Sequence, residues 1–186
     1  MNGQAIHERV YHVPVRFSQL CPSLVYNARM KDDAGALSRV FIGGVMQASN
    51  IGKDLLDQSY RAEIAAALQA RWPQTDIVDP LLLHPNSPAY DDAAARETLF
   101  AMAELAARSD LVIVYLPVAS MGTALEMYMA HQAGVPVLAI SPMLTNWVVR
   151  ALSTRLFPDM EAFRQALAGS DSLTELAGLG RQRHQA

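Results

Sequence analysis

Apolar runs of strand length alternate with segments of helical period from about residue 39 onward. The predicted strands, in chain order, are 40–42, 76–78, 111–115 and 135–140. The run Leu111-Val112-Ile113-Val114-Tyr115 contains no charged residue, which is typical of a central parallel strand buried on both faces. Alternation of this kind indicates βα units around a parallel sheet.

The helical segments lie between and after these strands. They are predicted at about 52–71, 92–108, from Thr123 to Gly134, 146–156 and 158–167. The first stops at Trp72-Pro73, because a residue that precedes proline disfavours the helical conformation, and Gly134 is expected as a C-cap. We therefore expect an α/β fold, a flavodoxin- or Rossmann-like three-layer sandwich with a mostly parallel sheet of about five strands.

A length of 186 residues fits one domain with an appendage. Residues 1–37 show no sustained period and contain several turn-forming residues, so we expect an N-terminal arm there. Residues 38–170 are predicted to form the α/β domain, and residues 171–186 a flexible tail. The segment 80–90 contains three prolines and is predicted to be a loop long enough to be functional.

Composition narrows the classes of function. The net charge is -3 and no cluster of Lys and Arg occurs, so a nucleic-acid partner is not expected. Apolar runs end before the ~18 residues of a membrane span, so no membrane partner is expected either. With Cys21 as the single cysteine and no leader-like start, we expect a cytoplasmic protein. The scattered histidines predict no metal site, and no cofactor is expected.

Two loops follow predicted strands at the edge where parallel sheets bind ligands. Such loops lead into helix N-termini, whose free N–H groups and dipole attract anions. The first starts with Gly43-Gly44 and includes Gln47, and the second is Ala119-Ser120-Met121-Gly122-Thr123. Glycine allows close backbone approach, and the serine and threonine hydroxyls can donate to a phosphate or sugar oxygen. A Gly-Gly pair after a strand also fits a tight turn with no ligand.

Glu126 fits two interpretations. The segment Thr123-Ala124-Leu125-Glu126 matches a capping box, in which the glutamate reaches back to a backbone donor and contributes ~1 kcal/mol to stability. Alternatively, a carboxylate one turn into this helix points over the strand end, where it can attack or stabilise the anomeric carbon of a sugar. The residues by themselves leave both interpretations open.

The order of these motifs resembles the nucleoside 2-deoxyribosyltransferase superfamily over about residues 39–150. The similar segments are Phe41-Ile42-Gly43-Gly44, 109–117, Ser120-Met121-Gly122-Thr123-Ala124-Leu125-Glu126-Met127 and Ala133-Gly134-Val135-Pro136-Val137. The resemblance implies that Glu126 is the nucleophile that takes the (deoxy)ribosyl group from a nucleobase. It also implies a homodimer or higher homo-oligomer with composite sites, in which Asn146 matches a residue given by a neighbouring subunit. An asparagine before a helix is also a common N-cap.

Ser120 directs the resemblance toward one branch of the superfamily. The transferases typically carry Asp at this position, whereas the nucleoside 5′-monophosphate N-glycosidases carry a serine that helps to bind the 5′-phosphate. A carboxylate repels a phosphate, but a hydroxyl at a helix N-terminus can donate to one. The substrate-binding residues implied around Glu126 are Gly43, Gly44, Gln47, Ser120, Gly122, Thr123 and Asn146.

Two positions depart from that branch. Met102 stands where the glycosidases carry the Asp that assists base departure or activates water, and Gln47 stands where they tend to have a phosphate-binding arginine. Glu104 is not expected to replace that Asp, because residues two apart on a helix point ~200° from each other. Asp91 and Asp92 precede the helix and could swing toward the site, but an N-cap role is expected for either.

The sequence predicts cleavage or transfer at the N-glycosidic bond of a nucleoside or nucleoside 5′-monophosphate through a ribosyl-Glu126 intermediate. The alternative is a non-catalytic nucleotide-binding or sensor protein of the same fold. Such a protein would have kept the pocket and lost the second carboxylate.

Overall fold

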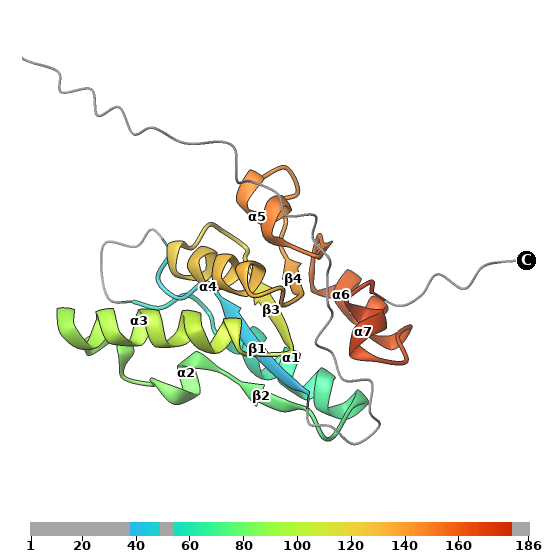
Figure 1. The fold of residues 1–186 in the computed structure, drawn as a ribbon, viewed down its shortest axis with the longest axis horizontal. Coiled ribbons are helices and arrows are strands. Elements are labelled where there is room, and N and C mark those ends of the chain that lie inside the picture. Colours follow the sequence, from blue (N-terminus) through green and yellow to red (C-terminus); the bar gives the residue numbers. More distant parts are fainter. Residues whose placement is uncertain (1–37, 49–53, 180–186) are drawn as a thin grey trace, which may run out of the picture.

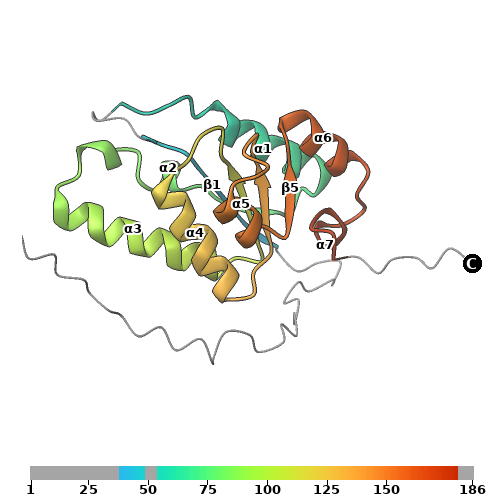
Figure 2. The ribbon, with the colours of Figure 1, turned by 90° about the horizontal axis from the view of Figure 1, so that it is seen from above.

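The computed structural model describes residues 38–48 and 54–179, which form a three-layer α/β domain (Figures 1 and 2). The strands are β1 (Arg39–Gly44), β2 (Asp76–Val78), β3 (Leu111–Tyr115), β4 (Val137–Ile140) and β5 (Arg155–Phe157). All neighbouring strands pair in parallel. The predicted α/β fold with a parallel sheet of about five strands is confirmed, and the predicted arm at 1–37 lies outside the described residues.

The strand order of the sheet is β2-β1-β3-β4-β5. The chain thus runs from β1 to β2 on one side and then crosses back to β3 on the other side of β1. Doubly wound sheets with this order bind ligands outside the carboxyl ends of β1 and β3, where the winding direction reverses. Both loops that we expected to face a ligand begin at these two strand ends.

Helices cover both faces of the sheet (Figure 2). They are α1 (Ser59–Arg71), α2 (Pro80–Leu83), the 3-10 helix η2 (Ser87–Ala89), α3 (Asp92–Ala107), α4 (Met121–Gln132), α5 (Trp147–Leu152), α6 (Met160–Ala168) and α7 (Leu173–Leu176). Side chains of α1, α6 and α7 share one buried cluster with the strands, and those of α3, α4 and α5 share the other.

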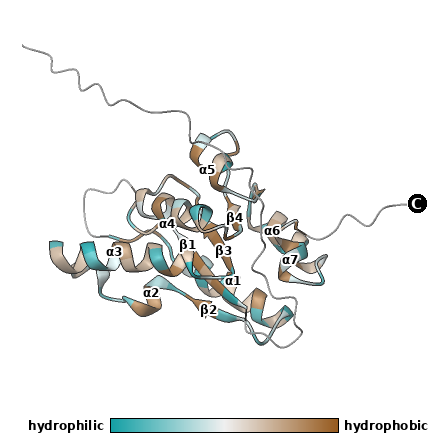
Figure 3. Cartoon of the chain, viewed as in Figure 1, coloured by the Kyte–Doolittle hydropathy of each residue, from teal (hydrophilic) through white to brown (hydrophobic). Residues whose placement is uncertain are grey.

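The central strands β3 and β4 carry no charged residue because both of their faces are covered, whereas the edge strands β2 and β5 contain Asp76 and Arg155 (Figure 3). In β1, Val40 and Ile42 enter the cluster under α1, whereas Phe41 enters the cluster under α3 and α4. All three are fully buried, and burial of one such side chain stabilises the fold by about 1.5–3 kcal/mol. Within the two described ranges, no helix is both long and apolar enough to span a bilayer.

The first helix starts at Ser59, so the prediction of a start near residue 52 is wrong. Gln58 explains the difference, because its side-chain amide donates to the carbonyls of Val45 and Leu56, both at 2.9 Å. These bonds hold the chain before the helix against the loop that follows β1. Leu55, which periodicity placed on the helix, lines a cavity instead.

The predicted helix at 146–156 is wrong in its second half. The helix α5 ends at Leu152, and β5 follows as the fifth strand of the sheet. Thr154 makes two bonds to β4, since its N–H donates to the Val137 carbonyl at 2.8 Å and its hydroxyl accepts from the Val137 N–H at 3.0 Å. Pairing with a distant strand thus overrides the local helical pattern.

The predicted flexible tail begins too early. Leu173, Leu176 and Ala177 belong to the buried cluster that α1 and α6 also enter. Arg71 of α1 fixes the approach to this segment by donating to the Ser170 carbonyl at 2.9 Å. The α/β domain therefore extends beyond residue 170, and its last described residues reach 179.

Leu176→Ala should lower the free energy of unfolding by about 2–5 kcal/mol, because it leaves a cavity at a fully buried side chain. Leu82→Ala is the matched control, since Leu82 is 78% exposed, and it should change stability by less than about 0.5 kcal/mol. Urea titration of both variants measures the difference. Equal stabilities would show that the C-terminal segment does not pack on the core.

Candidate functional site

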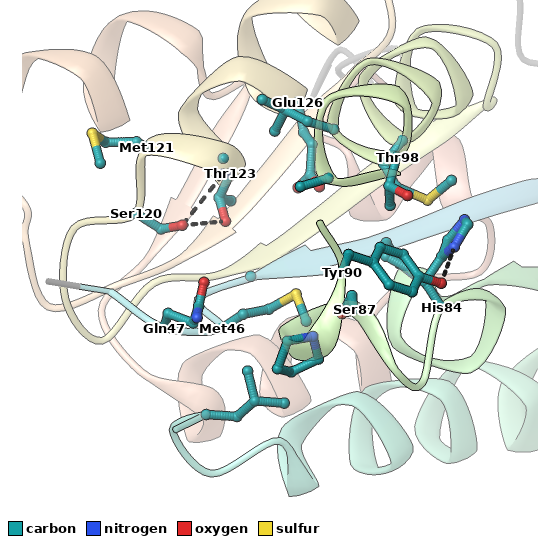
Figure 4. Close-up of a pocket in the computed structure, with 18 of the residues that line it drawn as sticks. Met46, Gln47, His84, Ser87, Tyr90, Thr98, Ser120, Met121, Thr123 and Glu126 are labelled. Atoms are coloured by element: carbon teal, nitrogen blue, oxygen red, sulfur yellow. Dashed lines mark hydrogen bonds between the residues drawn. The ribbon is translucent and has the colours of Figure 1, made fainter. Parts of the chain in front are cut away.

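A cavity of about 390 Å³ lies at the carboxyl ends of β1 and β3 (Figure 4). Its walls are the loop after β1, the segment 80–90, the helix α3 and the N-terminal end of α4. Small-molecule sites usually have volumes of roughly 300–1,000 Å³. The cavity is therefore large enough for a ligand of nucleoside size.

Most of the predicted site residues meet at this cavity. Those that line it are Gly44, Gln47, Ser120, Gly122, Thr123 and Glu126. Gly43 lies beside it, in contact with the carboxylate of Glu126. Asn146 is not among the lining residues, and its exposed side chain caps α5 by accepting from the N–H groups of Val148 and Val149.

Glu126 does not form the predicted capping box. The helix α4 begins one turn earlier than that box requires, and Ser120 is its N-cap, with Oγ accepting from the Thr123 N–H at 3.3 Å. Glu126 therefore lies in the second turn of α4, and its side chain lines the cavity (Figure 4). The capping interpretation is wrong, which leaves a carboxylate beside open space.

The Glu126 carboxylate rests on the backbone of β1. A Cβ atom built on Gly43 would stand 2.7 Å from Oε2 of Glu126, so the space for this oxygen exists because residue 43 has no side chain. Gly44 has φ +153°, a conformation that other residues rarely adopt, and a Cβ there would collide with the Tyr60 hydroxyl. The Gly-Gly pair thus makes room for Glu126 on one side and for Tyr60 on the other.

One oxygen of the Glu126 carboxylate, Oε2, is buried and has no hydrogen-bond partner among the described residues. Removal from water raises the pKa of Glu126 to about 8, and the positive charge of Arg61 partly opposes this rise. A strongly perturbed acid beside a cavity is a candidate functional group.

Arg61 does not line the cavity but acts on Glu126, and the sequence analysis missed it. Its side chain is 3% exposed, and its Nη1 donates to the Ile42 carbonyl at 2.7 Å and to Asp79 Oδ1 at 3.0 Å. The guanidinium thereby joins the end of β1 to the residue that follows β2. It also supplies the positive charge that acts on Glu126.

A periodicity signal for Arg61 was present in the sequence. Arg61 lies three and seven residues before Ile64 and Leu68, both fully buried, and therefore shares their helix face. Arginine is almost never fully buried unless it is paired. A charge on this face predicts a buried partner, but the sequence does not identify Asp79 as that partner.

The segment 80–90 forms the wall of the cavity opposite α4 (Figure 4). It contains α2 and η2, so the loop predicted at 80–90 includes two short helices. His84 Nδ1 and Tyr90 Oη are 3.0 Å apart, and Ser87 Oγ is buried with no partner in the described structure. All three side chains line the cavity, and none was singled out from the sequence.

The hydroxyl of Ser120 is a donor at the N-terminus of α4. Its oxygen accepts from the N–H of Thr123 at 3.3 Å and from the Thr123 hydroxyl at 3.0 Å. Because a hydroxyl has two lone pairs and one hydrogen, these bonds use its accepting capacity and leave the hydrogen for a ligand. This end of the cavity is suited to an oxygen-rich group such as a sugar or phosphate.

The positions around the expected second carboxylate carry no acid. Met102 lines the cavity and is 6% exposed, so its thioether lies on the wall where an Asp was expected. Glu104 pairs with Arg108 on the exposed side of α3. Asp91 caps α3 by accepting from the Ala94 N–H at 2.9 Å, in agreement with its expected role.

The described residues that line the cavity provide neither a permanently positive side chain nor a cluster of metal ligands. Among the described residues that line the cavity there is no Lys or Arg. Nor do three or more His, Cys, Asp or Glu side chains anywhere in 38–48 and 54–179 group closely enough to hold a metal ion.

Among solved structures, a 2-deoxyribosyltransferase from the psychrotolerant bacterium Bacillus psychrosaccharolyticus matches this chain. The TM-score is 0.53 at 12% identity, and the match covers 75% of this chain and 96% of that one. The two proteins share a fold. A conserved protein from Enterococcus faecalis V583 aligns with a TM-score of 0.47 at 17% identity, over 72% of this chain and 99% of that one. No protein-family model and no curated protein matches the sequence.

Glu126→Gln should change the pH dependence of stability. The pKa of this carboxyl is 4.5 in its ordinary state and about 8 in the fold, so the folded state binds the proton more tightly. The stability that the fold gains from this tighter proton binding is therefore fully present below about pH 4.5 and is lost as the pH rises through about 8. Urea titrations from about pH 5 to about pH 9 should show the wild type losing stability relative to the variant.

The control for this titration is Glu104→Gln, which removes an exposed carboxylate from α3. Its stability should follow that of the wild type across the same pH range. If Glu126→Gln also ran parallel to the wild type, the carboxyl would not be held in its neutral form by the fold.

Proposed function

We propose that this protein cleaves or transfers the N-glycosidic bond of a nucleoside or nucleoside 5′-monophosphate through a glycosyl intermediate on Glu126. The observation that carries the proposal is the Glu126 carboxylate, which lines a nucleoside-sized cavity and has an unpartnered oxygen above Gly43. The fold shared with a 2-deoxyribosyltransferase supports it. The resemblance of residues 120–127 to the same superfamily is a second support.

The nucleoside is placed with its sugar between Glu126 and the N-terminus of α4. The Ser120 hydroxyl donates to a sugar oxygen, or to a 5′-phosphate, which the free N–H groups at the start of α4 also attract. Because burial raises the pKa of Glu126 to about 8, the carboxyl first gives up its proton. Its ionised oxygen then attacks C1′ while the C1′–N bond breaks and the electron pair of that bond leaves with the base. Water or a second base then attacks C1′ and releases the carboxylate.

A second candidate function is a nucleotide-binding sensor without catalysis. The observation that favours it is Met102, whose thioether occupies the wall where the related glycosidases carry an acid. A sensor of this kind binds its ligand saturably and is stabilised by it against heat, but it releases no free base.

We also propose that two copies of the chain assemble through the surface formed by α5, the residues just before it and the start of α4. Its exposed apolar side chains are Met121 (88%), Leu144 (48%), Trp147 (85%) and Val148 (48%). Met121 also lines the cavity, so this surface borders the site. Asn146 lies on the same surface and would enter the site of the second copy.

Glu126→Gln should slow the release of free base by about 10³-fold or more, because the amide oxygen is a poor nucleophile. Wild type and variant are incubated with a panel of nucleosides and 5′-monophosphates, and free base is measured by chromatography. Glu104→Gln serves as the control and should keep wild-type activity.

Unchanged turnover in Glu126→Gln would rule out the assigned nucleophile. Thermal stabilisation of the wild type by a panel compound without any base release would favour the sensor function instead.

Trp147→Asp should convert a dimer into a monomer, because it places a charge in an apolar contact. Light scattering at micromolar protein concentration measures the mass. The control is Leu82→Asp, which places the same charge at an exposed apolar position on α2, away from the proposed contact. It should leave the mass unchanged. A monomeric wild type would contradict the assembly.

A further inference from the structure

The proposed reaction needs a proton for the departing base. When the C1′–N bond breaks, the base nitrogen takes the electron pair, and an ordinary nucleobase leaves far more easily if an acid protonates it. Met102 has no proton to donate, and Thr98, which also lines the cavity from α3, has no acidic group. The α3 wall therefore does not supply the acid.

The segment 80–90 carries ionisable groups on the opposite wall. Of the described residues that line the cavity, only Glu126, His84 and Tyr90 ionise. Glu126 is the attacking group in the proposed function, which leaves the two others. Their 3.0 Å contact joins His84 Nδ1 to Tyr90 Oη, and the ring of Tyr90 meets that of His84 edge-on.

We propose that His84 protonates the departing base and that Tyr90 positions its ring. This inference rests on the function proposed above. In the imidazolium form, the Nδ1–H donates to Tyr90 Oη, which leaves the Nε2–H for the base. The His84 ring bonds Tyr90 through Nδ1, and its Nε2 forms no hydrogen bond with a described residue.

Protons and electron pairs balance over both halves of the reaction. In the first half, Glu126 forms a bond to C1′, the C1′–N electron pair goes to the base nitrogen, and that nitrogen takes the proton from His84. In the second half, a water oxygen forms a bond to C1′ and the pair of the C1′–O bond returns to Glu126. The proton lost by water goes to His84 and restores the imidazolium.

Ser87 supports placing the base on this wall. Its Oγ is buried and unpartnered in the described structure, and buried hydroxyls seldom lack a partner in a native protein. The edge of a nucleobase offers both donors and acceptors to such a hydroxyl. Pro80 and Pro88 line the same wall and provide apolar contact for the faces of the ring.

The test compares substrates that differ in their need for an acid. The first is the nucleoside of the panel that the wild type cleaves fastest. The second group is 7-methylguanosine and the p-nitrophenyl furanosides of ribose and 2-deoxyribose, whose leaving groups depart without a proton. The variants are His84→Gln and Tyr90→Phe, with His131→Gln on α4 as a control that does not line the cavity.

His84→Gln should lower kcat on the ordinary nucleoside by about 10²–10⁴-fold and on the activated substrates by less than about threefold. Tyr90→Phe should show the same selectivity with a smaller loss, because it keeps the ring and removes only the hydrogen bond. Thermal melting confirms that each variant is folded, and His131→Gln should match the wild type on both substrate classes.

Equal losses on both substrate classes, or no loss on either, would overturn the role of His84 and leave Glu126 as the proposed nucleophile. The inference is supported if the wild type cleaves both substrate classes, Glu126→Gln loses activity on both, and His84→Gln loses activity on the ordinary nucleoside alone. A wild type that cleaves no substrate of either class would overturn both proposals together.

Discussion

A single buried guanidinium, that of Arg61, connects the segments that surround the cavity. It donates to the Ile42 carbonyl just before the Gly-Gly pair and to Asp79 just after β2, and its Nε donates to Gln58 at 2.8 Å. Gln58 in turn fixes the chain between the β1 loop and α1. Loss of either member of a buried ion pair leaves the other charge unpaired, so these contacts depend on each other.

The fold could be predicted from the sequence wherever burial dictates the pattern. Strands covered on both faces leave uninterrupted apolar runs, as Val112 and Ile113 do in β3. The elements that were missed depend on distant partners. Residues 155–157 become a strand through pairing with β4, and Leu176 is ordered by packing beneath α1 and α6. Neither effect is visible in a short window of sequence.

For the candidate site, the sequence predicted the residues on the β1 and α4 side of the cavity and missed those on the segment 80–90. The β1 and α4 side follows from glycines and hydroxyls next to recognisable strands, so Gly44, Ser120 and Glu126 were anticipated. The placement of Glu126 was still ambiguous, because the capping interpretation depends on where α4 begins, and Ser120 decides that. His84 and Ser87 reach the cavity through the folding of the segment 80–90, where Asp79 and Pro80 mark the start of α2 but no periodicity shows which side chains face the cavity.

That segment is held at both of its ends. Asp79 accepts from Arg61 and from the Leu81 N–H, while Asp91 accepts from the Ala94 N–H at the start of α3. A wall tied down on either side has little conformational freedom left to lose when a small molecule arrives. More of the contact energy between such a wall and a bound molecule then appears as affinity.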